Sequence, residues 1–166
     1  SVRDRLLIRS RETGESHQAL LTRYALERLL YRLSESDASD RFVLKGAYAF
    51  LVWQGNMHRP TKDVDLLGYG SPDVLEATLK SICRTDVEDD GVEFAPASIS
   101  VEAIRDQDEY DGMRVHIPAT IGSAQLRLQV DVGFGDAIVP DPNRVDFPVL
   151  LDFPAPSLQS YPRETV

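Results

Sequence analysis

The chain has 166 residues, 42% of them hydrophobic, and a net charge of −9 at pH 7, which suits one globular domain with a core of its own. It has no run of about 18 apolar residues and no N-terminal stretch of signal-peptide type, so we expect a cytoplasmic protein with no membrane span. The single cysteine, Cys83, excludes an internal disulfide and a cysteine-pair zinc site, and we interpret it as a small buried hydrophobic residue.

The charge is unevenly distributed along the chain. Residues 1–62 carry 11 Lys and Arg against 7 Asp and Glu, whereas residues 63–166 carry 7 against 20. A basic N-terminal third can hold a polyanion that the acidic remainder repels, but two ordinary solvated surfaces explain the same counts. Under the first interpretation, the candidate contacts are the arginines of the first expected helix, Arg3, Arg5, Arg9 and Arg11.

The N-terminal third predicts two helices. Residues 3–12 form a short basic helix that stops at Gly14, and Ser16 then has the residue type of an N-cap. The longer helix that follows places apolar residues at helical spacing and ends near the polar cluster at 34–40. These apolar residues are Leu20, Leu21, Tyr24, Leu26, Leu29, Leu30 and Leu33.

The middle of the chain alternates between strand and helix. A short apolar strand over 42–44 is joined at Gly46 to a helix over 47–53. A second strand over 64–67 is followed by a helix that opens at Ser71-Pro72, an N-cap followed by proline at the first helical position.

After Gly91 the pattern changes to strands, which we expect at 92–94, 99–104, 113–117 and 124–132. The last of these alternates between apolar and polar residues, so Arg127, Gln129 and Asp131 share its polar face. Six prolines between residues 140 and 162 predict an extended or looped stretch. This order of elements predicts an α+β fold with a mixed β-sheet flanked by helices.

Two carboxylates near the start of the second strand form the sharpest chemical feature. Residues i and i+2 of a strand face the same side, so Asp63 and Asp65 project together while Val64 faces the core. Two carboxylates on one face can close on a single hard cation. A pair of solvent-facing acids at a strand end is the alternative.

The surroundings of this pair favour the metal. At the strand–helix turn, Gly46 lets the backbone come close to a ligand, and the N–H groups at the start of the helix can bind phosphate. Lys45 can add a positive charge nearby. Asp131 can supply a third carboxylate from the polar face of its strand, and a solvated surface acid is the alternative. Three acids around two Mg²⁺ ions suit phosphoryl transfer.

At this point the sequence resembles the DNA polymerase β-type nucleotidyltransferase superfamily, and within it the AbiEii/AbiGii toxin family. The resemblance covers most of residues 15–166 in order. It rests on the segments ERLLYRL (27–33), FVLKG (42–46), RPTKDVDL (59–66), YDGMR (110–114) and QVDVGFGD (129–136).

The resemblance implies a toxin of a bacterial toxin–antitoxin or phage-defence system, with a cognate antitoxin as partner. It implies an Mg²⁺-dependent enzyme that moves a nucleoside monophosphate from an NTP onto an acceptor, the 3′ end of tRNA. By the match, Asp63, Asp65 and Asp131 are the catalytic, Mg²⁺-binding residues. Lys45 and Gly46 lie near the triphosphate, with Arg59 and Thr61 close by.

The resemblance also divides the chain. We expect an N-terminal helical segment over 1–40, a nucleotidyltransferase core over 41–140, and a proline-rich extended segment over 141–166 that leads to a C-terminal helical domain. That domain starts with an Ala-Glu-Lys motif that this sequence does not contain, so we expect weak activity and self-association of this chain alone. The superfamily also places Gly or Ser where this chain has Ala47, so position 47 offers a ligand its backbone N–H but no hydroxyl.

Two alternatives stay open. One is a nucleotidyltransferase-like module that binds a partner or an NTP without turnover. The other is an enzyme of the same fold that modifies protein hydroxyls. The sequence does not choose between RNA and protein acceptors, and it does not name the NTP.

Overall fold

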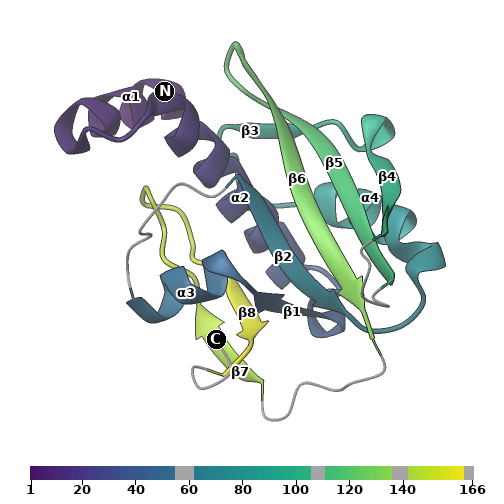
Figure 1. Cartoon of the computed structure of the whole chain (residues 1–166). Helices are drawn as coiled ribbons and strands as arrows, with labels where there is room; N and C mark the ends of the chain where they lie inside the picture. Colours follow the sequence, from purple (N-terminus) through teal and green to yellow (C-terminus); the bar gives the residue numbers. More distant parts are fainter. Residues whose placement is uncertain (55–61, 106–110, 136–141, 163–166) are drawn as a thin grey trace.

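The structure, a computed structural model, describes residues 1–54, 62–105, 111–135 and 142–162 (Figure 1). It consists of four α-helices and one eight-stranded sheet within these residues. The helices are α1 (Val2–Thr13), α2 (His17–Glu35), α3 (Ala47–Gln54) and α4 (Leu75–Cys83). The strands are β1 (Phe42–Lys45), β2 (Asp63–Gly68), β3 (Val92–Phe94), β4 (Ser100–Arg105), β5 (Asp111–Ile121), β6 (Ala124–Phe134), β7 (Asn143–Asp146) and β8 (Ser157–Ser160).

The two N-terminal helices begin and end at the residues that the sequence indicates. Gly14 ends α1 in the left-handed conformation, with φ at 77°, and its N–H donates to the carbonyl of Ser10. Ser16 caps α2, because its hydroxyl accepts a hydrogen bond from the backbone N–H of Ala19. Both helix boundaries predicted from the sequence are therefore confirmed.

The sheet is mixed, in the order β3-β5-β6-β2-β1-β8-β7, and β4 pairs with the same edge of β5 as β3. Its centre combines two directions, since β2 is antiparallel to β1 and parallel to β6. The parallel pair runs from Asp63 opposite Gln129 to Gly68 opposite Phe134. The α+β class and the mixed sheet are confirmed.

One face of the sheet is covered by α2 and α4, which lie behind it in Figure 1. Apolar side chains of the two helices meet Val64, Leu66 and Val130 of the central strands there. These three strand residues are at most 3% exposed. The opposite side chains of β2 and β6 therefore point toward the viewer, away from both helices.

Buried charges on α2 fix the segment between β7 and β8. The Glu27 carboxylate accepts a hydrogen bond from the N–H of Leu150 at 2.7 Å, and Arg28 donates to the carbonyl of Pro154 at 2.6 Å. Glu27 and Arg28 also form an ion pair of 2.8 Å with side chains only 1% exposed. A looped segment thus becomes part of the interior, because its backbone groups satisfy charges that would be costly to bury alone.

The strand expectations hold with two differences. β5 runs from Asp111 to Ile121, longer than the predicted 113–117, because it forms a long hairpin with β6. The proline-rich stretch contains β7 and β8, which extend the sheet beyond β1. The stretches between the prolines are too short to show a clear alternation of apolar and polar residues, so the sequence did not predict these two strands. The division of the chain into segments at residues 40 and 140 stays a prediction. Helix α2 of the N-terminal segment packs on β5, β6 and β8.

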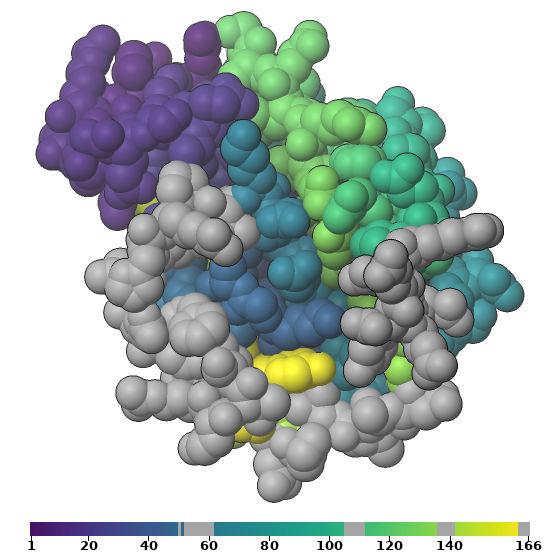
Figure 2. Space-filling model, in the orientation of Figure 1, coloured from purple at the N-terminus to yellow at the C-terminus, as the bar shows by residue number. Residues whose placement is uncertain are grey.

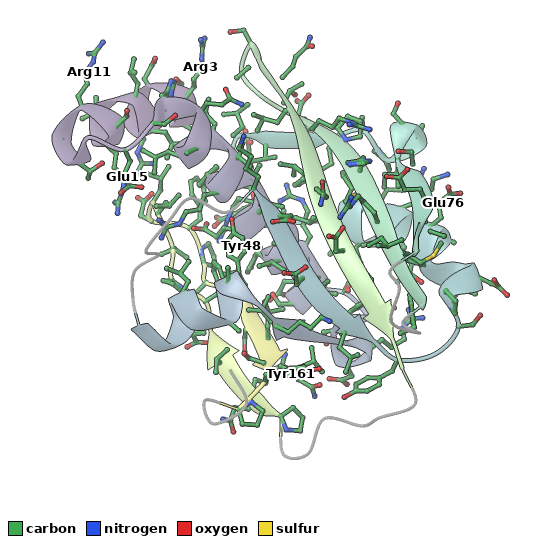
Figure 3. All side chains as sticks on the ribbon, in the orientation of Figure 1. Arg3, Arg11, Glu15, Tyr48, Glu76 and Tyr161 are labelled. Carbon is green, nitrogen blue, oxygen red and sulfur yellow. The ribbon has the colours of Figure 1, made fainter. Side chains whose placement is uncertain are left out.

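The arginines of α1 point in different directions. Arg5 pairs with Asp152 at 2.8 Å, and Arg9 donates to the carbonyl of Leu150 at 3.1 Å, so both help hold α1 to the rest of the chain. Arg3 and Arg11 project away from the sheet (Figure 3). Arg3 also donates to Ser123 at the tip of the β5–β6 hairpin, at 2.6 Å. The helices of the described ranges are all too short or too polar to span a bilayer.

Candidate active site

Three aspartates meet on the open face of the sheet. Asp63 and Asp65 lie on β2 on either side of Val64, whose side chain is buried in the core, so both carboxylates emerge on the other face. Asp131 on β6 is the register partner of Asp65. One carboxylate oxygen from each aspartate lies within 4.8 Å of the other two. The structure thus brings together the three acids that the sequence pattern grouped.

The triad is accessible as well as fixed. The core side of β6 carries Leu128, Val130 and Val132, each at most 1% exposed, which hold the strand against the helices. The side chain of Asp131 keeps 17% of its surface exposed. In the space-filling view, atoms of β2 and β6 lie next to each other at the surface of this face (Figure 2). A ligand can therefore reach carboxylates whose backbone is rigid.

Gly46 lies against the triad because no side chain intervenes. Its φ is 72°, a left-handed conformation that favours glycine. A Cβ atom added at this position would lie only 2.5 Å from Oδ2 of Asp65. The first turn of α3 starts at Ala47, the next residue, so its N-terminal backbone N–H groups begin beside the carboxylate, and that of Ala49 donates to the carbonyl of Gly46 at 3.1 Å. With alanine at 47, an anion can be bound there only through the backbone.

Lys45 provides the positive charge on the other side of β2. It is the antiparallel register partner of Asp65, so the two side chains share a face. A Cβ added at Gly133 on β6 would lie 3.3 Å from the Lys45 Nζ. The ammonium group therefore reaches across β2 and lies over a glycine that leaves room for it.

Arg114 on β5 is a site residue that received no role from the sequence, although it ends the segment YDGMR (110–114). It is the register partner of Asp131. Its Nε donates to Oδ1 of Asp131 at 3.0 Å and its Nη2 donates to Oδ2 at 3.2 Å. These hydrogen bonds, together with the charge of Asp131, raise the pKa of Arg114 above its ordinary value. The pair is bidentate, the arrangement that best matches a guanidinium to a carboxylate.

Gln129 is the second such residue, although its place on the polar face of β6 was expected. It lies opposite Asp63 in the register. Its Nε2 donates to Oδ2 of Asp63 at 3.2 Å and to the two oxygens of Asp131 at 3.4 and 3.3 Å. The amide thus spaces the two carboxylates apart. The motifs contain Arg114 and Gln129 but did not reveal their roles, because both residues act through cross-strand neighbours.

The electrostatics of the triad favour a cation. Burial raises the pKa of Asp65, and the negative charges of Asp63 and Asp131 raise it further, against the opposing effects of Lys45 and Arg114. Three acceptor groups that repel one another and lie within reach of one ion form the oxygen-rich donor set that Mg²⁺ prefers. The residues present therefore fit a hard divalent metal.

Two predicted nucleotide contacts lie outside the described ranges, and two histidines lie away from the site. Arg59 and Thr61 both fall within 55–61, so their placement is outside the described residues. His116 contacts Arg127 at 3.1 Å, and His17 contacts the carbonyl of Arg3 at 3.3 Å. Neither histidine is within the aspartate cluster.

The fold is shared with two solved structures from Helicobacter pylori. JHP933 from Helicobacter pylori superimposes with a TM-score of 0.56 at 17% identity, over 90% of this chain and 54% of its own. A second H. pylori structure, described as that of a putative nucleotidyltransferase, has a TM-score of 0.56 at 17% identity. The match covers 91% of this chain and 56% of the H. pylori chain. The chain therefore spans little more than half the length of these relatives.

The family follows from the sequence match. The model of the nucleotidyl transferase AbiEii toxin family, a type IV toxin–antitoxin family, matches residues 28–166. The chain belongs to this family, which confirms the resemblance drawn from its motifs. No curated protein matches the chain at a significant level.

Proposed function

We propose that this protein is a Mg²⁺-dependent nucleotidyltransferase toxin that moves a nucleoside monophosphate from an NTP onto an acceptor. The observation that carries the proposal is the meeting of Asp63, Asp65 and Asp131 on one face, with oxygens within 4.8 Å. Membership of the AbiEii family gives this cluster its chemical context.

Asp63, Asp65 and Asp131 are the residues that would hold Mg²⁺. When bound, the metal supplies charge neutralisation for the triphosphate and lowers the pKa of an attacking hydroxyl. The half-buried position of the three carboxylates strengthens their attraction for a cation relative to acids in bulk water.

The residues around the triad suit a triphosphate. The ammonium group of Lys45 lies over β6, and the N-terminal N–H groups of α3 begin beside Asp65. Both features attract phosphate oxygens. Arg59 and Thr61 complete the proposed nucleotide contacts from the part of the chain that is not described.

The proposed acceptor is the 3′ end of tRNA, and the proposed setting is a cytoplasmic toxin–antitoxin or phage-defence system with a cognate antitoxin. The type IV toxin–antitoxin description of the family supports the antitoxin. Arg3 and Arg11 on α1 support a polyanionic acceptor, because they project outward (Figure 3). This surface lies in the basic third of the sequence.

The test uses purified protein with each labelled NTP and bulk tRNA, in Mg²⁺ and in EDTA. We expect label to enter RNA with one NTP, only in Mg²⁺, and not with Asp65→Asn. The matched control is Asp73→Asn, which removes an exposed acid outside the site and should retain activity. Equal labelling by the Asp65 variant would contradict the assignment of the triad.

A second candidate is a module that binds nucleotide without turnover. It is favoured by Ala47, which offers a ligand its backbone N–H but no hydroxyl. Binding of Mg²⁺–NTP without transfer to RNA or protein, in this chain and in a longer form of the protein, would select it. Label in protein rather than RNA would select the enzyme that modifies protein hydroxyls.

A further inference from the structure

The row of charges across the sheet extends beyond the triad. Successive register partners place Lys45, Asp65, Asp131, Arg114 and Glu102 side by side on β1, β2, β6, β5 and β4. Arg114 therefore lies between two acids, Asp131 and Glu102. It bonds both oxygens of Asp131, and Glu102 also raises its pKa.

We propose that Arg114 is a tethered cation that shares Asp131 with the metal and leaves it for the triphosphate when Mg²⁺–nucleotide binds. The inference rests on the proposed function and deepens it. It makes Arg114 a positioning residue for Asp131 and a ligand for phosphate oxygens. Its consequence is that Mg²⁺ and nucleotide bind cooperatively.

The competition follows from the geometry of one carboxylate. Arg114 donates to Oδ1 at 3.0 Å and to Oδ2 at 3.2 Å, so it engages both oxygens of the carboxylate. A cation bound to Asp131 would draw on the negative charge of the same two oxygens and weaken the pair. Free Mg²⁺ brings no anion for the guanidinium, whose other acidic neighbour is Glu102, so Mg²⁺ binding is weakened by the loss of the pair.

The neighbouring row of the sheet offers Arg114 a place to move. Gly133 and Gly112 are register partners on β6 and β5, and both lack side chains. Lys45 Nζ lies over Gly133 from one side, and Arg114 follows two residues after Gly112 on the other. The side chain of Arg114 is 38% exposed, so it is not locked in the interior. Two cations thus lie at this strip of two glycines, whose row neighbours are Leu67 on β2 and Ile104 on β4, and the space left by the missing side chains suits a polyphosphate.

The triphosphate changes the balance because it provides anions for the released guanidinium. Mg²⁺ then gains Asp131 while Arg114 gains phosphate oxygens, and the cost of breaking the pair is offset. Coupling between two ligands is reciprocal, so nucleotide must raise the affinity for Mg²⁺ by the same factor as Mg²⁺ raises the affinity for nucleotide.

The experiment measures Mg²⁺ binding by calorimetry, with and without a non-hydrolysable NTP analogue, in Arg114→Gln and in the control Arg127→Gln. Arg127 is an exposed arginine on the same face whose partner is His116, so its replacement changes the net charge equally. We expect Arg114→Gln to bind Mg²⁺ alone about tenfold more tightly than Arg127→Gln does. We also expect the factor by which nucleotide raises the affinity for Mg²⁺ to be about tenfold smaller in Arg114→Gln.

Arg114→Lys tests the bidentate geometry. It keeps the charge but cannot donate in a fork, so it should bind Mg²⁺ alone more tightly than wild type and keep part of the nucleotide effect. It also keeps the test usable if the glutamine variant folds poorly.

Two outcomes separate this inference from the proposed function. If wild type binds Mg²⁺, Asp65→Asn abolishes that binding, and Arg114→Gln matches Arg127→Gln, the inference is wrong and the metal site stands. Weaker Mg²⁺ binding by Arg114→Gln also overturns it, because Arg114 would then only support Asp131. If wild type binds no Mg²⁺ even with nucleotide, the proposed function itself fails.

Discussion

The carboxylate of Asp65 lies where any side chain at position 46 would have to go. A Cβ at Gly46 would come to 2.5 Å from Oδ2 of Asp65, closer than two such atoms can approach. The turn at Gly46 and strand β2 therefore pack closely against each other, so that Asp65 on the strand leaves no room for a side chain at position 46.

Gly46→Ala should consequently damage the site more than the fold. The positive φ of 72° costs about 1–2 kcal/mol for alanine, and the clash in addition displaces Asp65. Gly14→Ala is the matched control, since its φ is 77° and an added Cβ there meets nothing within 4 Å. We expect similar decreases of stability by denaturation, but loss of Mg²⁺ binding only at position 46. Retained binding in Gly46→Ala would show that Asp65 can move without consequence.

Asp63→Asn should remove most of the Mg²⁺–NTP affinity and leave the fold intact. The charge of Asp63 is one cause of the raised pKa of Asp65, so its removal relieves repulsion and should not lower stability in EDTA. Gln129 can still donate to the asparagine oxygen that replaces Oδ2. Calorimetry with Mg²⁺–NTP and thermal unfolding in EDTA check the two parts. Asp73→Asn should change neither.

The acceptor hypothesis is tested most cleanly at Arg11. Arg5 and Arg9 hold the segment at 150–152, and Arg3 donates to Ser123, so replacing any of these three would disturb structure as well as charge. Reversing Arg11 to glutamate should flatten the slope of log affinity for tRNA against log salt by about one if this arginine neutralises one phosphate. Arg84→Glu, at the end of α4, serves as control. An unchanged slope would make α1 a structural element.

Cys83 should react slowly in the native protein. Burial raises the pKa of its thiol to about 11 from an ordinary value of 9.0. At neutral pH the thiolate fraction is then about a hundredfold lower than in the unfolded chain, because each pKa unit is a factor of ten. Alkylation rates in native and denaturing conditions measure this difference. Equal rates would mean that the C-terminal end of α4 opens readily.

The transfer activity of residues 1–166 alone is a separate prediction. The solved relatives are almost twice as long, since this chain covers 54–56% of them. We expect residues 1–166 to fold, because the core lies within them, but to transfer nucleotide about 10²–10³ times more slowly than a longer form that supplies a further charge. Comparable turnover would show that the triad suffices. The mass in solution tests the expected self-association.

The sequence predicted the parts of the site that depend on local chemistry. Alternation along β2 and β6 placed Asp65 and Asp131 on polar faces, and a glycine between strand and helix marked the turn. Caps at Gly14 and Ser16 were equally local. These features are set by residues a few positions apart, so pattern alone reveals them.

Arg114 was not predicted because its role depends on pairing across strands. The two-residue turn at Gly122-Ser123 sets the register of β5 against β6, and that register places Arg114 opposite Asp131. The sequence carried this signal, since Gly122 has the positive φ that such turns require. β8 had no comparable local signal, since its place is fixed by the buried charges of α2.

The position of β8 has a practical consequence for labelling the molecule. The N–H of Tyr161, just after β8, donates to the carbonyl of Leu44 at 3.0 Å, one residue before Lys45. A fluorophore or affinity tag placed soon after this point would start beside the proposed phosphate-binding strip and could obstruct it. The start of α1 lies at the opposite end of the view from β8 in Figure 1, so reporters for metal and nucleotide binding belong at the N-terminal end.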